Sequence, residues 1–482
     1  MSRLILDALE NLFAIGWLTL DWWLIGVAGL LSAFASGHAL LHKRYPQAAL
    51  GWIAVVWLMP LYGPILYGIL GVNRVRARAQ AMDYGWRPPP AYKATPSVPA
   101  SRQRLASVAR TITGTALCGG NRVVPLHGGE AAYEQMLGAI EGAQDRIWLA
   151  SYIFDADEAG YQFIDALYRA TQREVDVRVL VDGIGALYSR PKITKALRKR
   201  GIPFALFIPP RLFPPSFHIN LRNHRKLLVV DTATSFTGGM NIGNRHLLEK
   251  PGNRAATQDI HFRIEGPVTA QLAHLFAHDW RFASGEALPN VSLPACEEVA
   301  PTWCRTVVDG PDENLDRLRA LILAALSNAR ETVRIMSPYF LPGQDLIAAM
   351  TNAALAGVQV EVILPEKNNL PPVAWAMHAI IPRMFSRGVR FWMQPEPFAH
   401  SKLLLVDDDY ALVGTANIDA RSLRLNFEVG LEIYDRKVAG ALNEHFEDVL
   451  GLSSAVTNEY LQSRKLPTRL RDAAAWLLSP YL

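Results

Sequence analysis

An eight-residue pattern occurs twice in this chain, and the repeat limits the possible folds more than any other feature. The first copy is His224-Arg225-Lys226, four apolar residues and Asp231; the second is His400-Ser401-Lys402, four apolar residues and Asp407. Both copies read H-x-K-x-x-x-x-D. A glycine and an asparagine follow each copy at matching distances, since 400 − 224 and 417 − 241 both equal 176. The matched spacing indicates an internal duplication, which also pairs Gly238 with Gly414 and Asn241 with Asn417.

The elements predicted around each copy repeat as well. A helical pattern precedes an apolar strand that ends at Ser151-Tyr152 in the first half and at Ser337-Pro338-Tyr339 in the second. Another helix and another strand follow in each half before the motif is reached. Alternating helices and strands of this kind build layered α/β domains. We therefore predict two α/β domains, at 111–295 and 296–482.

Two uncharged apolar runs lie ahead of the repeat, over about 22–41 and 48–70. Each run is long enough to cross the hydrocarbon layer of a membrane, and only 19% of all residues in the chain are charged. We predict two transmembrane helices within 21–72, joined as a hairpin. The preceding segment, 1–20, suits an interfacial helix and a poorly ordered extension equally well.

The stretch 73–110 is rich in proline and basic residues, and we predict that it is a linker. The arginines that follow the second apolar run predict, by the positive-inside rule, that the rest of the chain is cytoplasmic. Lys43 and Arg44, in the loop between the two runs, oppose this orientation. We expect a multi-pass protein of the bacterial inner membrane with cytoplasmic catalytic domains; the arginines are Arg74, Arg76, Arg78 and Arg87.

Overall charge and cysteine content restrict the function only broadly. A net charge of +5 and a pI near 9.0 favour anionic partners but do not separate lipid headgroups from nucleic acids. The three cysteines, Cys118, Cys296 and Cys304, show no Cys-x-x-Cys spacing. This pattern indicates neither a disulfide framework nor a zinc ribbon.

The motif itself suits phosphodiester chemistry. Histidine and lysine two residues apart in a strand project from the same face, so an imidazole lies beside an ammonium group. A neutral imidazole can attack phosphorus while lysine neutralises charge on the non-bridging oxygens. Glycines allow close backbone approach, and asparagine amides can donate hydrogen bonds to the same oxygens. Two facing half-sites supply one histidine for attack and one for proton transfer to the departing alkoxide.

A metal site fits this pattern poorly. A protonated lysine has no lone pair to offer a metal, and no cluster of histidine, cysteine and aspartate surrounds the motif in the sequence. We expect no metal and no other cofactor.

These motifs resemble those of the phospholipase D superfamily, and more closely those of its bacterial cardiolipin synthase branch, which has two N-terminal spans. The resemblance covers nearly the whole chain. Its last stretch is more characteristic of cardiolipin synthases than of nucleases. The residues that carry the resemblance are Asn223–Lys226, Thr237–Asn241, His400–Lys402, Gly414–Asn417 and Arg421–Glu428.

The resemblance implies two phospholipase D-like domains about a pseudo-two-fold axis, with both histidines in one cleft between them. By family habit, His224 attacks one phosphatidylglycerol to form a phosphatidyl-histidine, while His400 protonates the leaving glycerol. His400 then deprotonates the headgroup of a second phosphatidylglycerol, which resolves the intermediate to cardiolipin.

The resemblance also implies roles for the remaining site residues. Lys226 and Lys402 would hold phosphate oxygens, whereas Asp231 and Asp407 belong to the motif as structural supports. Family members use a later carboxylate to orient each histidine, and Asp259 and Glu428 occupy suitable positions, Glu428 being the better match. Supporting residues around the phosphate would be Asn241, Asn417, Gly238 and Gly414.

Three other functions compete with cardiolipin synthesis. With water as acceptor the same site would make a phospholipase D, and with serine a phosphatidylserine synthase. A nuclease is disfavoured by the two apolar runs and the mildly basic composition, so we expect no nucleic-acid partner. A silent membrane scaffold would be expected to lose a motif residue, and none is missing. We expect phosphatidylglycerol and anionic membrane lipids as partners, and the sequence leaves phosphatidylethanolamine open as the second substrate.

Overall fold

The computed structural model describes residues 2–43, 46–72, 84–85, 87–89, 98–210, 221–291 and 302–479, with side chains from residue 22 onward. The chain forms two compact units, Met1–Arg78 and Ala79–Leu482.

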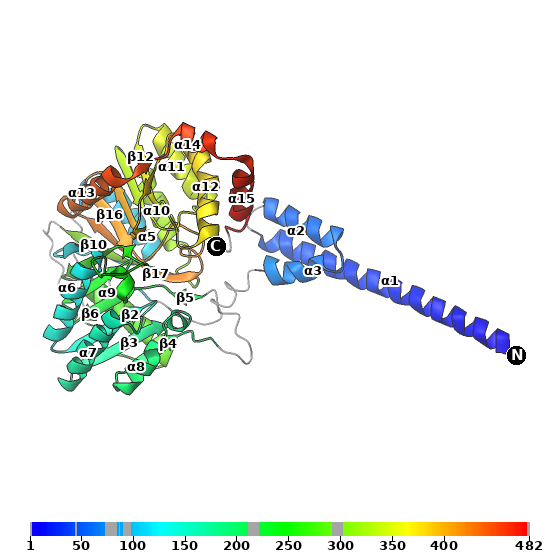
Figure 1. Ribbon diagram of the computed structural model, residues 1–482, viewed down its shortest axis with the longest axis horizontal. Helices are drawn as coiled ribbons and strands as arrows, with labels where there is room; N and C mark the ends of the chain where they lie inside the picture. Colours follow the sequence, from blue (N-terminus) through cyan, green and yellow to red (C-terminus); the bar gives the residue numbers. More distant parts are fainter. Residues whose placement is uncertain are drawn as a thin grey trace. The chain divides into compact units, whose positions relative to one another are not determined.

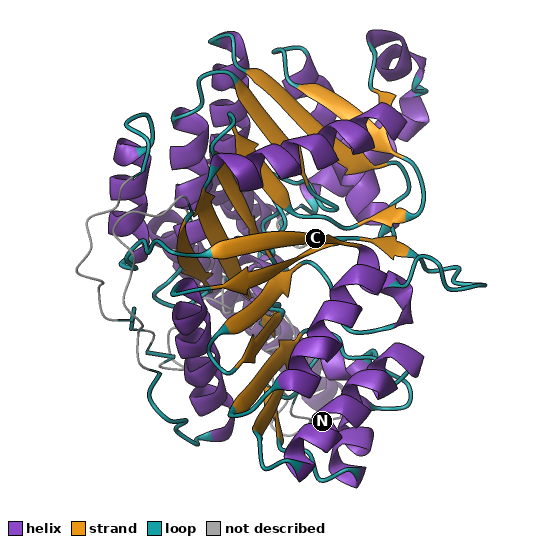
Figure 2. Cartoon of the chain, turned by 90° about the vertical axis from the view of Figure 1, so that its left-hand side faces the viewer, coloured by secondary structure: helices purple, strands orange, loops and turns teal. Residues whose placement is uncertain are grey.

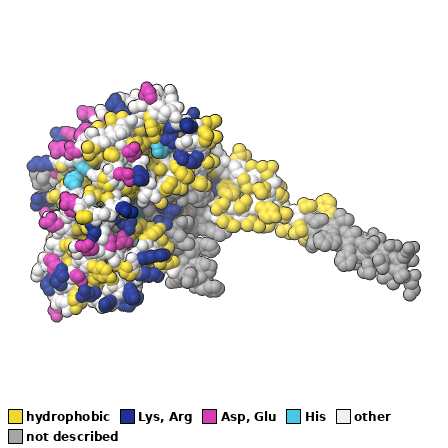
Figure 3. Space-filling model, in the orientation of Figure 1, with side chains coloured by type: hydrophobic (Ala, Val, Ile, Leu, Met, Phe, Trp, Pro, Cys, Tyr) yellow, Lys and Arg dark blue, Asp and Glu magenta, His cyan; other side chains and the backbone are white. Residues whose placement is uncertain are grey.

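The N-terminal unit is helical, and its described surface is apolar. Helix α1 spans Ser2–His42, and its Trp22–His42 portion is long and apolar enough to cross a membrane. Figure 3 shows hydrophobic side chains covering this part of the unit, where Phe34 is 77% exposed and Leu58 is 80% exposed. Water would not favour so much exposed apolar surface, whereas lipid would. The helix predicted over 22–41 is confirmed.

The prediction of one continuous helix over 48–70 is wrong. Helix α2 ends at Leu58, after Pro46–Leu58, and the chain turns over 59–62. Pro60 and Pro64 lack the amide hydrogen that a continuous helix would use there. The chain resumes as α3 (Gly63–Leu66) and a π-helical turn, η1 (Tyr67–Gly71). A Cβ atom on Gly63 would lie 2.6 Å from the Val56 Cα atom, so α3 begins tight against the end of α2.

The predicted linker also extends too far, because 103–113 is the helix α5 (Gln103–Thr113). Leu105 and Ala109 of α5 are buried with Leu321 of the second half. Arg102, just before α5, is buried and donates to Asp407 at 2.7 Å and to Asp409 at 2.6 Å. A segment that precedes the first α/β domain therefore packs on the second.

Each half of the larger unit contains a mixed sheet with the same strand order. The first sheet runs β1 (Arg122–His127), β9 (Ile260–Glu265), β7 (Thr234–Gly238), β6 (Leu227–Val230), β2 (Arg146–Ser151), β3 (Asp176–Asp182), β4 (Phe204–Phe207). The second runs β10 (Trp303–Asp309), β17 (Asn426–Tyr434), β16 (Tyr410–Gly414), β15 (Leu403–Val406), β11 (Thr332–Met336), β12 (Gln359–Pro365), β13 (Arg390–Gln394), β18 (Ser454–Ala455). In both, the motif strand pairs antiparallel with β2 or β11, which starts a parallel run. The predicted pair of α/β domains is confirmed.

Helices cover both faces of each sheet, as Figures 1 and 2 show. The outer face of the first sheet packs against α6 (Gly128–Gly142), α7 (Glu158–Gln172) and α8 (Ile193–Lys199). The second sheet packs against α10 (Arg317–Ser327), α11 (Gln344–Leu355) and α12 (Pro371–Phe385), with α14 (Asn458–Ser463) and α15 (Leu466–Leu477) following at the end of the chain. Short 3-10 turns lie at Gly185–Leu187 (η2) and Asn244–His246 (η4).

Two long helices, α9 (Val268–Ser284) and α13 (Arg436–Leu452), form the layer between the sheets. Their buried side chains join residues from both sheets in one hydrophobic cluster. Phe276 of α9 stacks on Trp148 of the first sheet at 5.5 Å, and α9 also packs on β10 of the second. The two domains therefore share a central core and cannot shift independently without exposing it.

Short strands cross between the domains just before each motif histidine. Strand β5 (Arg222–Asn223) pairs with β17 of the second domain, and the His224 amide donates to the Phe427 carbonyl at 2.9 Å. In the other half β14 (Phe398–Ala399) pairs with β8 (Thr257–Gln258), and the His400 amide donates to the Gln258 carbonyl at 2.8 Å. Each motif histidine is thus attached to the other domain through its backbone.

Gly414→Ala should destabilise the fold, because Gly414 has a φ of +152° and its Cβ atom would lie 2.2 Å from the Val429 carbonyl oxygen. We expect a loss of roughly 1–3 kcal/mol, measured as a lower thermal unfolding midpoint in detergent. The matched control is Gly440→Ala on α13, where an added Cβ meets nothing within 4 Å. That control should keep or raise the midpoint, and equal midpoints for the two variants would contradict the close strand approach.

Candidate active site

The motif histidines enter the site from the crossing strands, and the motif lysines follow at the start of β6 and β15. His224 and His400 both line one cavity of about 590 Å³, together with Asn241 and Asn417. The structure therefore brings the two half-sites together, as the duplication predicts.

His224 is held by a carboxylate from the second domain. Its Nδ1 atom lies 3.0 Å from the carboxylate of Glu428, which is on β17 and fully buried. Thr415 Oγ1 and Asn426 Nδ2 also donate to this carboxylate, at 2.6 Å and 3.1 Å. Burial raises the pKa of Glu428, but the charges of His224 and Lys226 and these hydrogen bonds lower it below the ordinary value. Glu428 is therefore an ionised acceptor for the Nδ1 hydrogen of His224.

His400 is held in the same way by the first domain. Its Nδ1 atom lies 2.7 Å from Asp259 Oδ2, and the Ile260 amide donates to Asp259 Oδ1 at 2.8 Å. Asp259 is also buried, and this burial raises its pKa even though Lys402 acts against it. The two histidine–carboxylate pairs thus have the same geometry and different acidities.

Both imidazoles are neutral in the free site. Burial lowers the pKa of His224 to about 4, with Lys226 adding to the effect against Glu428. Burial and the charges of Lys402 and Lys226 lower the pKa of His400 well below its ordinary value. Nδ1 of each ring faces a carboxylate, which leaves Nε2 as the second nitrogen of each imidazole, and Nε2 of His400 lies 3.2 Å from Lys402 Nζ.

The motif lysines are buried cations beside the histidines. Lys226 Nζ donates to the His224 carbonyl at 2.7 Å, and Lys402 Nζ lies 3.0 Å from His400 Nδ1. Burial lowers the pKa of Lys226 to about 7 and that of Lys402 to about 8. Among the described residues no carboxylate is in hydrogen-bonding contact with either lysine, and such buried positive charge favours an anion in the adjoining cavity.

Arg225 lies between the histidine and the lysine of the first motif copy, and its long side chain reaches the second domain. This residue is fully buried, pairs with Asp279 of α9 at 2.5 Å, and donates to the carbonyls of Glu428 and Asp309, both at 3.1 Å. These contacts join the first motif to two strands of the second domain. Ser401 holds the equivalent place in the second copy.

The motif aspartates lie outside the cavity. Asp231 and Asp407 follow the far ends of β6 and β15 with φ of +52° and +55°. Asp231 accepts from the backbone amides of residues 144–146, and Asp407 accepts from those of residues 330–332. They fix the loops that lead into β2 and β11.

The predicted glycines support the carboxylates and do not line the cavity. Gly238 has a φ of +150°, and its Cβ atom would lie 2.8 Å from the Ile260 carbonyl oxygen. Gly239, beside it, would place a Cβ atom 2.4 Å from the Asp259 carboxylate. Gly414 is pressed in the same way against β17. These glycines let the carboxylate-bearing strands approach the motif strands.

Two tyrosines of the cavity were missed as site residues, although the sequence carried a signal for them. The Tyr152 ring lies 5.0 Å from that of His224, and the Tyr339 ring lies 6.4 Å from that of His400. Tyr152 directly follows Ser151, the last residue of β2, and Tyr339 lies two residues after Ser337, which directly follows β11. Other cavity residues that sequence reasoning missed are Tyr188, Arg222, Arg245, His246, Asp419 and Phe398.

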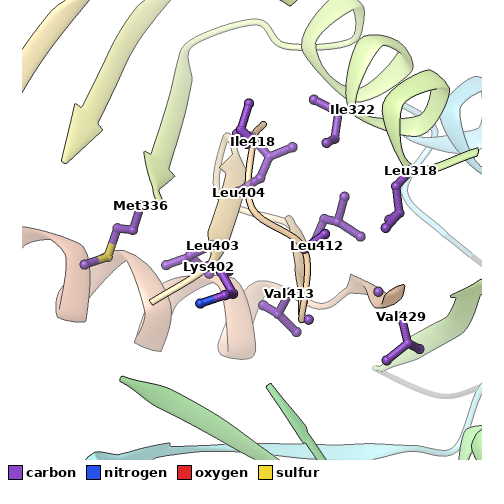
Figure 4. Close-up of a pocket in the computed structure, with 13 residues that line it drawn as sticks. Leu318, Ile322, Met336, Lys402, Leu403, Leu404, Leu412, Val413, Ile418 and Val429 are labelled. Atoms are coloured by element: carbon purple, nitrogen blue, oxygen red, sulfur yellow. The ribbon is translucent and has the colours of Figure 1, made fainter. Parts of the chain in front are cut away.

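A second, much smaller cavity of about 40 Å³ lies behind Lys402. Figure 4 shows the lysine directed away from the apolar side chains of Leu318, Ile322 and Leu412. This apolar backing keeps water from the lysine stem and leaves the charged end for the larger cavity.

In the described part of the chain, no group of three or more histidine, cysteine, aspartate and glutamate side chains could hold a metal ion.

The comparisons with known proteins agree with this geometry. The family described as cardiolipin synthase, PLD-like domain, matches residues 136–280 and 322–450, one segment in each half. The chain is 34% identical to the major cardiolipin synthase ClsA of Bacillus subtilis over 75% of this chain and 76% of that protein. It is 32% identical to cardiolipin synthase A of Pseudomonas putida (strain ATCC 47054) over 95% of this chain and 98% of that protein.

The chain belongs to the bacterial cardiolipin synthase family of the phospholipase D superfamily. Cardiolipin synthases are phosphatidyltransferases, so the chain is an enzyme of that class. Its fold is also that of a solved phosphatidylserine synthase from Haemophilus influenzae, with a TM-score of 0.61 at 17% identity over 79% of this chain and 100% of that one. At this identity the likeness concerns the fold alone.

The buried lysines predict a fall in phosphatidyl-transfer activity at alkaline pH. As the pH rises through about 7 for Lys226 and about 8 for Lys402, the free enzyme loses these cations, so kcat/KM should decrease. A bound phosphodiester anion favours the protonated lysines, so the alkaline fall of kcat should lie at higher pH than that of kcat/KM. Initial rates in mixed micelles across this range would measure both curves. Identical curves, or no alkaline fall below pH 10, would contradict the assignment.

Proposed function

We propose that this cardiolipin synthase transfers a phosphatidyl group from one phosphatidylglycerol to a headgroup hydroxyl of a second, giving cardiolipin and glycerol. One observation carries the proposal: two histidines, each held by a buried carboxylate of the opposite domain, line one cavity, and a buried lysine lies beside each histidine. The similarity to cardiolipin synthases over most of the chain supports this choice of reaction.

In the first step His224 is the nucleophile. Its Nε2 atom forms a bond to phosphorus while the bond from phosphorus to the headgroup glycerol oxygen breaks. The departing oxygen takes a proton from Nε2 of His400 and leaves as glycerol. Charge on the phosphoryl oxygens is neutralised by Lys226 and Lys402, and the asparagine side chains at 241 and 417 line the same cavity.

In the second step a headgroup hydroxyl of another phosphatidylglycerol gives its proton to His400 and attacks the same phosphorus. The phosphorus–nitrogen bond to His224 breaks, and cardiolipin is released. The protons balance, because His400 regains in this step the proton that it gave to glycerol in the first.

The two carboxylates support this division of roles. Glu428 is ionised more readily than an ordinary glutamate and accepts the Nδ1 hydrogen of His224, while burial keeps the imidazole neutral and its Nε2 atom nucleophilic. Asp259 is protonated more readily than an ordinary aspartate, so the pair of Asp259 and His400 can hold an additional proton. If that proton lies on Asp259, the carboxyl group donates to Nδ1 of His400 and the ring hydrogen is on Nε2. If it lies on the imidazole, both ring nitrogens carry a hydrogen. In either case Nε2 of His400 can give a hydrogen to the leaving group.

Asp231 and Asp407 act as structural supports in this proposal, and Gly238 and Gly414 position the strands that carry the orienting carboxylates. The domain limits of 111–295 and 296–482 remain our proposal for the two halves, with α5 added to the second by its packing. The proposed reaction uses only side chains of the described residues and assigns no step to a metal or another cofactor.

The alternatives change the acceptor and keep the site. Water would make the protein a phospholipase D, and serine would make it a phosphatidylserine synthase, whose fold it shares. Phosphatidylethanolamine as a second lipid would release ethanolamine in place of one glycerol. Cardiolipin synthesis is favoured over these because the relatives that carry that name align over most of the chain.

We further propose that the enzyme acts in the bacterial inner membrane, with its catalytic domains cytoplasmic and anionic lipids as its environment. The apolar Trp22–His42 helix supports a membrane location. The basic residues after the apolar segments, among them Arg74 and Arg87, support the cytoplasmic side.

The test is lipid mass spectrometry of the purified protein with phosphatidylglycerol vesicles. We expect cardiolipin and glycerol from the unsubstituted enzyme, and a loss of at least about 100-fold in His224→Ala and in His400→Ala. His274→Ala, on α9 and outside the cavity, is the matched control and should retain activity. Phosphatidic acid alone would replace the transferase assignment with a phospholipase D.

The same samples identify the nucleophile. His400→Ala removes the proton carrier of both steps, and any phosphatidyl adduct that still forms should lie on the peptide that contains His224. His224→Ala should form no adduct. An adduct on the His400 peptide of His224→Ala would exchange the two roles.

A further inference from the structure

The residues that line the active-site cavity are not equally charged in the two halves of the repeat. Arg245 and Arg421 are equivalent positions, each four residues after a cavity asparagine. Arg222 has Phe398 as its equivalent, since 398 − 222 also equals 176. One side of the cavity therefore carries an arginine where the related side carries an aromatic ring.

Arg222 has a neutral partner and a buried donor left over. Its Nη1 atom donates to the Tyr152 hydroxyl at 2.9 Å, and its Nε atom is buried with no hydrogen-bond partner among the described residues. The neighbouring acid Asp182 already accepts from the amides of Ile184, Gly185 and Asn223. A buried guanidinium donor in this state favours an anionic ligand.

Arg421 lies near Arg222, because both line the cavity and β5 places Arg222 opposite Asn426, whose amide donates to the Arg421 carbonyl at 3.0 Å. Burial, and then the charge of Arg222, lower the pKa of Arg421, while Asp419 acts in the opposite direction. The equivalent Arg245 is in a different state, because it donates to Asp155 at 2.6 Å. Two arginine side chains that line the same cavity can bind a phosphate there.

We propose that Arg222 and Arg421 bind the phosphate of the acceptor phosphatidylglycerol, the lipid that attacks in the second step. This inference rests on the proposed function, in which two phosphodiesters share one cavity. The motif lysines hold the phosphate that reacts, so the phosphate of the other lipid needs cations of its own.

The position of Tyr152 supports this arrangement. Its ring lies 5.0 Å from the His224 ring and its centre 5.4 Å from Lys226 Nζ, while its hydroxyl accepts from Arg222. Tyr152 thus separates the arginine site from the reacting site by about one aromatic side chain. The two phosphates of cardiolipin are joined by a single glycerol, which requires two anion sites that are neighbours.

The test compares two acceptors that use the same phosphatidyl-histidine. Cardiolipin synthesis uses an acceptor with a phosphate, whereas exchange of the phosphatidylglycerol headgroup with deuterated glycerol uses one without. Both products are measured by mass spectrometry on the full-length enzyme in phosphatidylglycerol vesicles. For Arg222→Gln and Arg421→Gln we expect cardiolipin synthesis to fall at least about tenfold and headgroup exchange to change less than about twofold.

Two further variants complete the experiment. Arg222→Lys keeps the charge and should retain an intermediate rate of cardiolipin synthesis. Arg122→Gln, at an arginine whose side chain is 75% exposed, is the matched control and should change neither rate. Equal losses of both reactions, or unchanged cardiolipin synthesis, would overturn the acceptor site. An unsubstituted enzyme that exchanges glycerol without making cardiolipin would refute the proposed function instead.

A separate inference concerns how often the chain crosses the membrane. Side-chain contacts show which position along the α1 axis lies beside each part of the segment 46–71. Ser32 Oγ donates to the Val56 carbonyl at 2.9 Å, and Trp57 Nε1 donates to Ser36 Oγ at 3.1 Å. Further along the chain, Tyr67 is 2.7 Å from His38 Nδ1, and the Gly71 carbonyl accepts from Lys43 Nζ at 2.6 Å. The chain therefore returns by Gly71 to the level at which α1 ended.

We infer that α1 crosses the membrane once and that 46–71 is a re-entrant hairpin. Helix α2 has 13 residues, or about 20 Å, against a hydrocarbon thickness of about 30 Å. The turn lies near the level of Ser32, ten residues before His42, which is about 15 Å or half the hydrocarbon layer. Lys43 and Gly71 are then on the same side, which removes the conflict that a two-span hairpin creates for the positive-inside rule.

Cysteine labelling in intact cells tests this topology. With one crossing, a cysteine at Ser2→Cys reacts with a membrane-impermeant maleimide from outside, whereas one at Lys192→Cys on the catalytic unit reacts only after permeabilisation. The unsubstituted chain gives the background from the native cysteines. Protection of both positions in intact cells would overturn the single crossing, as would labelling of both.

Discussion

Each motif histidine of this enzyme is held by a carboxylate from the domain that does not carry it. The pair His224–Glu428 joins residues 204 positions apart, and His400–Asp259 joins residues 141 apart. Because these carboxylates are buried, they are favourable only when both domains are in place. The crossing strands, the shared layer of α9 and α13 and the glycines beside the carboxylate strands all serve to keep these two contacts.

The same enclosure sets the electrostatics of the cavity. Burial lowers the pKa values of both imidazoles and of both lysines. A bound phosphodiester anion would stabilise the protonated lysines. Binding and activation are therefore one electrostatic event. The pseudo-symmetry supplies two similar half-sites, and small departures from it, such as Arg222 against Phe398, make the two sides of the cavity differ in charge.

The sequence predicted the duplicated α/β fold and most of the reacting groups, because both follow from local patterns that recur at a fixed spacing. It could not predict the exchange of Glu428 and Asp259 between domains, since pairing across more than a hundred residues leaves no periodic signal. Hydropathy alone could not separate a crossing helix from a hairpin in 48–70, because both are uniformly apolar. Arg222 was missed because its meaning comes from Tyr152, which meets it only in the folded protein.

The late position of β17 in the chain has a consequence for synthesis. Glu428 leaves the ribosome after both histidines and after the apolar helices that can already be inserted in a membrane. Until it arrives, His224 has neither its orienting carboxylate nor the backbone contact to Phe427. A growing chain at the lipid surface thus lacks both of these His224 contacts until β17 has joined the second sheet.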